Sequence, residues 1–169
     1  MESGFFKGRY LINLDSEDDG ELFIGCAGGT DTLISYPIRV LPHSAIGYAS
    51  VHIHIRGLKG GHSGDDIHKG RGNANKILAR LLWNAIQNHE IRISTIEGGN
   101  LRNAIPREAS AVISIKQSEQ SNLNHLIDDY TNAVFDEIKA VEADFSVHTE
   151  DVTRPEYYID PQCINPLIS

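Results

Sequence analysis

The sequence predicts an α+β fold in which two long helices pack on one face of a four-stranded antiparallel sheet. Three observations carry this prediction. Residues 49–56 alternate between apolar and polar side chains, as a half-buried strand does. Residues 73–89 place apolar side chains at helical spacing. Residues 91–97 and 108–116 are short and rich in β-branched residues, which is typical of strands.

The first strand and the first helix have the clearest patterns. The strand ASVHIHIR carries Val51, Ile53 and Ile55 on one face and His52, His54 and Arg56 on the other. In NANKILARLLWNAIQNH, Asn73 stands at the N-cap position, directly before a continuous apolar stripe. We therefore expect the apolar strand face to lie under the helix and the histidine-bearing face to lie away from it.

A similar pattern follows in the second half of this region. Gly98 and Gly99 form a turn between the two later strands, and Ser118 is a candidate N-cap for a second helix that runs to about Ala143. A last strand is expected at 144–150. The order β-α-β-β-α-β is the ferredoxin-like split βαβ plan. One face of such a sheet is uncovered, so two copies are expected to pair through this face or through the sheet edge.

The flanking segments differ from residues 45–150 in character. Residues 1–44 hold two short apolar segments joined by the acidic turn SEDDGE, which is too little for a domain, so we expect them to be the end of a larger sheet. Residues 151–169 hold three of the six prolines and show no periodicity. We interpret them as a tail or as the beginning of an interrupted segment.

Composition excludes several classes of protein. The chain has 169 residues, 40% of them apolar, which is enough for a core, and a net charge of −8. A nucleic-acid partner is not expected, because such binding requires a basic surface. No apolar run approaches the length that spans a membrane. Cys26 and Cys163 form no paired motif, which favours a reducing, cytoplasmic setting.

The segment GLKGGHSGDDIHKGRGNANK, at residues 57–76, contains too few apolar residues to be core. His62 lies within it between glycines, which let the backbone approach another surface closely. An imidazole on such a loop suits proton donation or oxyanion stabilisation, and a solvated loop histidine is the alternative. We expect Asp65, Asp66 and His68 to belong to a solvated loop.

Further candidate residues lie in other loops. The side-chain amide of Asn103 can bind a substrate carboxylate or carbonyl, or it satisfies its own turn. Arg102 and Arg107 flank it and can hold an anion, or they are surface charges. Asp15 ends an apolar segment and is a suitable metal ligand, although one ligand makes no site and a solvated acidic turn is the simpler interpretation.

His52 and His54 share one strand face at a spacing that can chelate a metal ion. The sequence places no third ligand near them. We therefore interpret them as an ordinary solvated pair.

Three motifs, in this order, make the chain similar to a known family: INLDSEDDGELFIGCAGG, GLKGGHSGDDIHKGRGNANK and GGNLRNAIPREA. They resemble the aminoacyl-histidine dipeptidases (Xaa-His dipeptidase, peptidase D) of the carnosinase- and aminoacylase-type dinuclear zinc peptidase superfamily. The resemblance runs through almost all of residues 9–143. It implies a cytosolic hydrolase of Xaa-His dipeptides with two zinc ions, whose catalytic domain is interrupted by a ferredoxin-like lid that forms a homodimer.

The resemblance also implies a division of the chain. Residues 1–44 would be the C-terminal remnant of the first catalytic-domain segment, and residues 45–150 would be the lid. Residues 151–169 would be a tail or a truncated continuation of the lid.

The same resemblance implies roles for three residues. Asp15 would be a zinc ligand, His62 would reach into the partner's active site and stabilise the tetrahedral intermediate, and Asn103 would bind substrate. The family's H-x-D motif and Glu-Glu pair are absent from the sequence, and no late histidine ligand is found. We therefore expect the chain to be inactive by itself and to bind zinc weakly or not at all. Lys116, or an arginine beyond Ser169, would bind the substrate carboxylate.

Two other functions agree with the same residues. The fold hosts many activities, so a non-catalytic module that dimerises or binds a small regulatory ligand is the main alternative. A complete but degenerate hydrolase would need metal ligands that the sequence does not show.

Overall fold

The computed structural model describes residues 4, 7–10, 12, 20–21, 24–25, 30–43 and 46–168. Its contacts divide the chain into two units, Met1–Tyr36 and Pro37–Ser169. The described residues of the first unit belong to no helix or strand. The two short apolar segments expected to end a larger sheet, residues 9–15 and 22–29, lie mostly outside the described residues.

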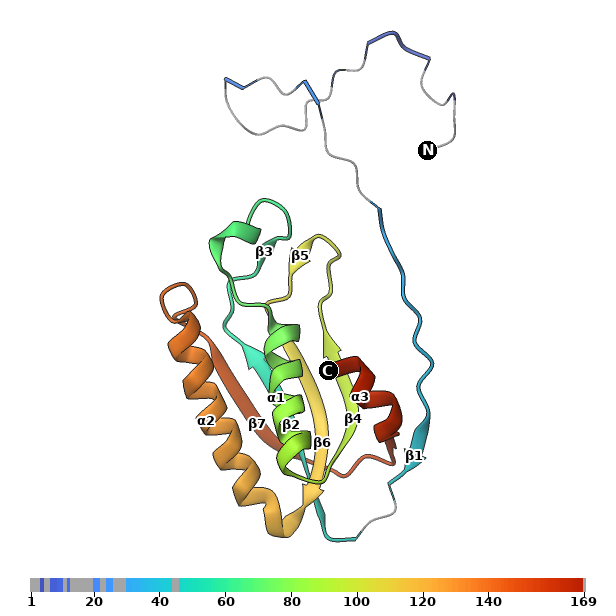
Figure 1. The fold of residues 1–169 in the computed structure, drawn as a ribbon, viewed down its shortest axis with the longest axis vertical. Helices are drawn as coiled ribbons and strands as arrows, with labels where there is room; N and C mark the ends of the chain where they lie inside the picture. Colours follow the sequence, from blue (N-terminus) through green and yellow to red (C-terminus); the bar gives the residue numbers. More distant parts are fainter. Residues whose placement is uncertain are drawn as a thin grey trace. The chain divides into compact units, whose positions relative to one another are not determined.

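The second unit is built around an antiparallel sheet of four strands in the order β4-β6-β2-β7. Its main elements are β2 (Tyr48–Arg56), α1 (Ala74–Asn88), β4 (Ile91–Gly98), β6 (Ala109–Lys116), α2 (Gln120–Ile138) and β7 (Ser146–Val152). β2 pairs with β6 on one side and with β7 on the other. Figure 1 shows α1 and α2 running alongside the sheet. This architecture confirms the predicted α+β, ferredoxin-like fold.

The core lies between the helices and one face of the sheet. In β2, Val51, Ile53 and Ile55 are buried, and in α1 Leu81 and Leu82 are fully buried. Complete burial of such a side chain is worth roughly 1.5–3 kcal/mol, so this layer supplies most of the driving force for folding. The alternation in the sequence therefore assigned the buried strand face correctly.

The two helices begin and end by different means. Asn73 caps α1 as predicted, because its side chain accepts a hydrogen bond from the Lys76 N–H (3.2 Å). The predicted cap at Ser118 is wrong: this residue lies in a 3₁₀ turn, Gln117–Glu119, and no side-chain cap hydrogen bond is formed at the start of α2. α2 also ends at Ile138, before the expected Ala143, because the following residues turn inward and bury the side chain of Glu142.

The C-terminal segment is folded onto the second unit. β8 (Tyr157–Ile159) pairs with β1 (Val40–Pro42), and α3 (Pro161–Ile168) follows. Ile159 and Ile164 join the core. Asp160 holds the junction, because its carboxylate accepts hydrogen bonds from Arg39 Nε (2.6 Å) and from the Gln162 N–H (2.9 Å). The sequence did not predict these elements, since they are short and their pairing partner lies near residue 40.

No helix formed by the described residues is long and apolar enough to cross a membrane.

Candidate functional site

His62 and Asn103, singled out separately in the sequence, lie on two loops that a two-stranded ribbon joins. β3 (Gly61–His62) pairs with β5 (Ala104–Ile105), so that His62 lies opposite Ala104. The Ser63 N–H then donates a hydrogen bond to the carbonyl oxygen of Asn103 (2.9 Å). Figure 1 shows this ribbon beyond one end of the four-stranded sheet. The ribbon therefore joins the glycine-rich loop to the loop that carries Asn103.

The ring of His62 is oriented by the backbone of its own loop. Its Nδ1 atom accepts hydrogen bonds from the N–H groups of Gly64 (3.2 Å) and Asp65 (3.1 Å). A neutral imidazole that accepts at Nδ1 carries its proton on Nε2. The Asp65 carboxylate, 3.5 Å from Nδ1, favours the opposite arrangement, but its side chain is 89% exposed and screened by water, so the two backbone donors decide. The half-exposed ring thus presents Nε2–H as a donor.

Asp66 holds the backbone beneath this ring. One carboxylate oxygen accepts from the His62 N–H (2.8 Å) and from Arg71 Nη1 (3.0 Å), and the other pairs with Lys69 Nζ (2.6 Å). The Lys69 contact, followed by the His62 N–H, lowers the pKa of Asp66 from 3.8 to about 2. The expected solvated loop is therefore wrong for Asp66, whose side chain is only 17% exposed.

A glycine is required where the loop crosses the Arg71 side chain. Gly61 has a φ of 147°, and a Cβ atom there would lie 2.1 Å from Arg71 Nη1. The same guanidinium nitrogen donates to the carbonyl oxygen of Gly60 (2.5 Å). Any side chain at residue 61 would displace Arg71 from both of its partners, so the glycines preceding His62 make the anchored loop possible.

Glu142 closes the base of the loop. Its side chain is fully buried, and its two oxygens accept from the N–H groups of Lys59 (2.8 Å) and Gly72 (2.9 Å). Gly57 allows the chain to pass close to this turn: it has a φ of 79°, and a Cβ atom would lie 1.8 Å from the carbonyl oxygen of Asp144. Sequence reasoning missed Glu142, because no local pattern distinguishes it from a surface glutamate.

A hollow of about 340 Å³ lies where β2 and β4 end and β6 begins. Arg56, Arg107 and Asn100 are among its lining residues, whereas Arg102 and Asn103 are not. Of the two arginines expected to hold an anion, Arg107 lines this hollow, together with Arg56.

The two remaining positions lie outside this arrangement. Asp15, the expected zinc ligand, is outside the described residues. Lys116 is the last residue of β6 and lies roughly 23 Å along the strand from the first residue, Ala109. The Lys116 Nζ atom pairs with the Glu90 carboxylate (2.7 Å). Lys116 therefore lies at the opposite end of β6 from the hollow that Arg107 lines.

The described residues form one group of three or more side chains suited to a metal ion: His52, His54 and Glu150. The sequence provided no third ligand for the histidine pair, and β7 supplies it, because Glu150 lies opposite His52 in the sheet register. These three side chains form one position that could hold a single ion. The described residues therefore do not fit a dinuclear zinc centre.

The fold and the ribbon define a lid-type domain, and the chain's similarities agree. Residues 45–142, more than half of the chain, match the peptidase dimerisation domain (M20_dimer), and the chain belongs to this family. It is 36% identical over 156 residues to the cytosol non-specific dipeptidase of Escherichia coli (strain K12), covering 91% of this chain and 32% of that protein. The resemblance to dipeptidases is thereby confirmed.

Solved structures agree with this assignment. The crystal structure of aminoacylhistidine dipeptidase from Vibrio alginolyticus matches with a TM-score of 0.81 and 37% identity, over 99% of this chain and 34% of that one. The structure of AtUAH in complex with glyoxylate matches with a TM-score of 0.51 and 16% identity, over 70% of this chain and 30% of that one, and shows the fold alone. The chain spans about a third of the length of these proteins.

Replacement of Glu142 by glutamine tests the loop base. Glu142→Gln keeps the size of the side chain but turns an N–H donor toward one of two backbone N–H groups. We expect the free energy of unfolding to fall by about 1–3 kcal/mol in urea denaturation. Glu108→Gln, at an exposed residue, should change it by less than about 0.5 kcal/mol. Equal effects of the two substitutions would show that the buried carboxylate does not close the loop.

The carboxyl group of Asp66 is expected to titrate near pH 2. Its folded-state pKa lies below the ordinary 3.8, so the ionised side chain stabilises the loop at pH values above 3.8, and this stabilisation is lost as the pH falls toward about 2. The side-chain ¹³C shift in an NMR titration measures the midpoint. Lys69→Met should raise the midpoint, since Lys69 is the largest cause of the shift. A midpoint near 3.8 in both proteins would contradict the described contacts.

Proposed function

We propose that the chain is the lid and dimerisation segment of a cytosolic zinc dipeptidase that hydrolyses Xaa-His dipeptides. The observation that carries this proposal is the ribbon that joins the loop of His62, whose ring presents an Nε2–H donor, to the loop of Asn103. Membership of the peptidase dimerisation domain family supports a homodimer. The similarity to two dipeptidases supports dipeptides as substrates, and only the name of the Vibrio alginolyticus enzyme supports the narrower Xaa-His class.

In this proposal the parts of the chain belong to different domains of the whole enzyme. Residues 1–44 belong to the catalytic domain and bring one zinc ligand, Asp15, while residues 45–150 form the lid and residues 151–169 continue it. The zinc ions would activate water for attack on the peptide carbonyl. The chain by itself hydrolyses no dipeptide, because it holds too few ligands for this centre.

His62 acts on the active site of the partner subunit. When water adds to the scissile carbonyl, negative charge develops on the carbonyl oxygen, and an oriented N–H donor stabilises that charge. The His62 Nε2–H is such a donor, and its direction is fixed by two backbone contacts at Nδ1. The Asn103 amide, on the adjoining loop, would hold a carboxylate or carbonyl of the substrate.

The same observation distinguishes this function from a purely regulatory module. A regulatory module has no need for an oriented imidazole donor and a side-chain amide on two loops joined by hydrogen bonds. Ligand binding alone could use the hollow near Arg107, which contains neither of these side chains.

A subunit-mixing experiment in the full-length enzyme tests the proposal. His62→Ala alone should lower kcat about 100- to 1,000-fold and leave the zinc content unchanged, because one oxyanion donor is lost. Asp15→Ala should lose zinc from the dinuclear centre and, with it, activity. If the two variants are unfolded together and refolded as mixed dimers, each heterodimer contains one complete site, and about a quarter of the wild-type activity should return.

Controls separate the possible outcomes of this experiment. His68→Ala, in the same loop but outside the ribbon, should retain its kcat, and Asp15→Ala refolded alone should recover nothing. Failure of the mixture to recover activity would show that His62 does not act across the dimer. Loss of zinc from His62→Ala in proportion to kcat would show that it is not an oxyanion donor.

A further inference from the structure

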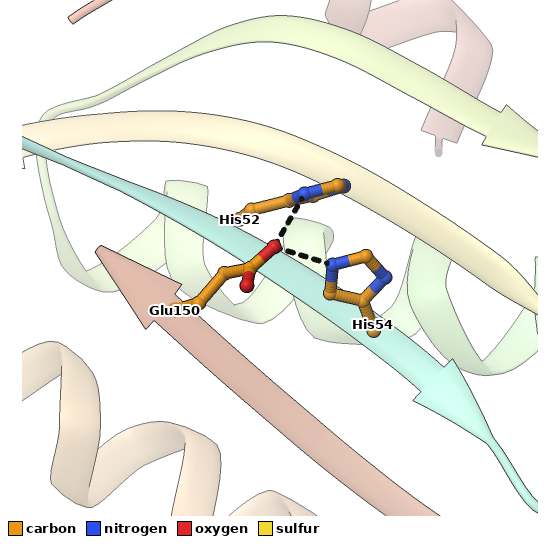
Figure 2. A group of neighbouring side chains, drawn as sticks. All are labelled: His52, His54 and Glu150. Carbon is orange, nitrogen blue, oxygen red and sulfur yellow. Dashed lines mark hydrogen bonds and ion pairs between the residues drawn. The ribbon is translucent and has the colours of Figure 1, made fainter. Parts of the chain in front are cut away.

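A compact group of metal-ligating side chains lies on the sheet face that points away from α1 and α2. His52 and His54 alternate with the buried Val51, Ile53 and Ile55 along β2, so both rings occupy the outer face. Glu150 reaches the same place from β7, opposite His52. Figure 2 shows the carboxylate of Glu150 joined to both rings.

The distances between the three candidate ligand atoms are close to those found around a bound metal ion. Glu150 Oε1 lies 3.2 Å from His52 Nδ1 and 3.1 Å from His54 Nε2, and one ligand atom from each residue lies within 4.8 Å of the others. Two ligands bound at about 2.1 Å to a tetrahedral metal lie about 3.4 Å apart. Side-chain rotations alone therefore bring the three atoms around one ion.

The sequence predicts that the chain binds zinc weakly or not at all. Against that expectation, we propose that His52, His54 and Glu150 bind one divalent transition-metal ion of the zinc type. Two imidazole nitrogens and one carboxylate oxygen favour Zn²⁺, Ni²⁺ or Cu²⁺, whereas Mg²⁺ and Ca²⁺ prefer oxygen ligands. Three protein ligands leave a fourth position for water or another group. The ion would join the edge strand β7 to the central strand β2.

The carboxylate is ready to bind a cation. The hydrogen bond from His54, followed by the one from His52, lowers the pKa of Glu150 below its ordinary value. Glu150 is therefore ionised at neutral pH. To bind a metal ion, each imidazole must offer an unprotonated ring nitrogen.

Arg56 opposes metal binding, because it holds His54 in the tautomer that cannot bind the ion. The Nη2 atom of Arg56 lies 3.3 Å from His54 Nδ1. A guanidinium can only donate, so His54 Nδ1 is the acceptor in this hydrogen bond. The proton of the neutral His54 ring therefore lies on Nε2, which faces Glu150. A metal on Nε2 requires the proton to move to Nδ1 and Arg56 to turn away. Removal of the Arg56 side chain should therefore strengthen metal binding.

Metal titration of the metal-free 169-residue chain tests the proposal. Competition with a chromophoric chelator should show one Zn²⁺ bound per chain, and Mg²⁺ should not compete. His52→Ala, His54→Ala and Glu150→Gln should each weaken Zn²⁺ binding by more than about 100-fold, since even loss of an outer hydrogen-bond partner costs 10- to 100-fold. His125→Ala, at an exposed histidine of α2, is the matched control and should leave binding unchanged.

Two further measurements exclude a merely structural effect of these substitutions. Arg56→Ala should tighten Zn²⁺ binding, which a loss of folding cannot do. In electron paramagnetic resonance spectra, Cu²⁺ bound to the wild-type chain should show two nitrogen ligands. Zn²⁺ binding that survives His54→Ala, or no stoichiometric binding by the wild-type chain, would overturn the proposal. Neither result would bear on the role of His62, which is tested by mixed dimers.

Discussion

The buried carboxylate of Glu142 is the contact on which the rest of the site depends. It accepts hydrogen bonds from two backbone N–H groups, at Lys59 and at Gly72, and so joins the beginning and the end of the glycine-rich loop. Hydrogen bonds to a charged group are worth roughly 1.5–3 kcal/mol each, which offsets the entropy lost when a polar loop is closed. The residue that closes the loop follows α2, whereas the loop precedes α1. The site is therefore completed only when the second half of the domain has folded onto the first.

A series of contacts connects this buried base to the exposed tip of the loop. The closed base determines where β3 begins, β3 pairs with β5, and β5 fixes the loop of Asn103. At the tip, Asp66 holds the backbone of His62, and two N–H groups hold its ring. At the base of the loop, Gly57, directly after β2, lies close to Asp144, shortly before β7. The proposed metal site joins β2 and β7, the same two strands. A bound ion would therefore also hold together the two chain segments that support the base of the loop.

Periodic patterns predicted the scaffold, and isolated side chains were harder to assign. The alternation in β2 and the capped stripe of α1 are local, so they can be seen in a short stretch of sequence. His62 and Asn103 could be singled out because glycines and a proline mark their loops. Glu142 and Glu150 could not, since each acquires its role from a partner more than fifty residues away. β8 was not predicted for the same reason, since its partner β1 lies near the other end of the second unit. The early end of α2 was not predicted either, because it depends on the distant partners of Glu142.

The proposed function depends most directly on the ring of His62, which the loop presents as an Nε2–H donor. Long-range ¹H–¹⁵N correlation spectra of the ¹⁵N-labelled chain, recorded at a pH where the ring is neutral, report which ring nitrogen carries the proton. The hydrogen bonds from Gly64 and Asp65 predict a protonated Nε2 and an unprotonated, accepting Nδ1. A proton on Nδ1, or a ring that exchanges evenly between the two forms, would contradict the claim.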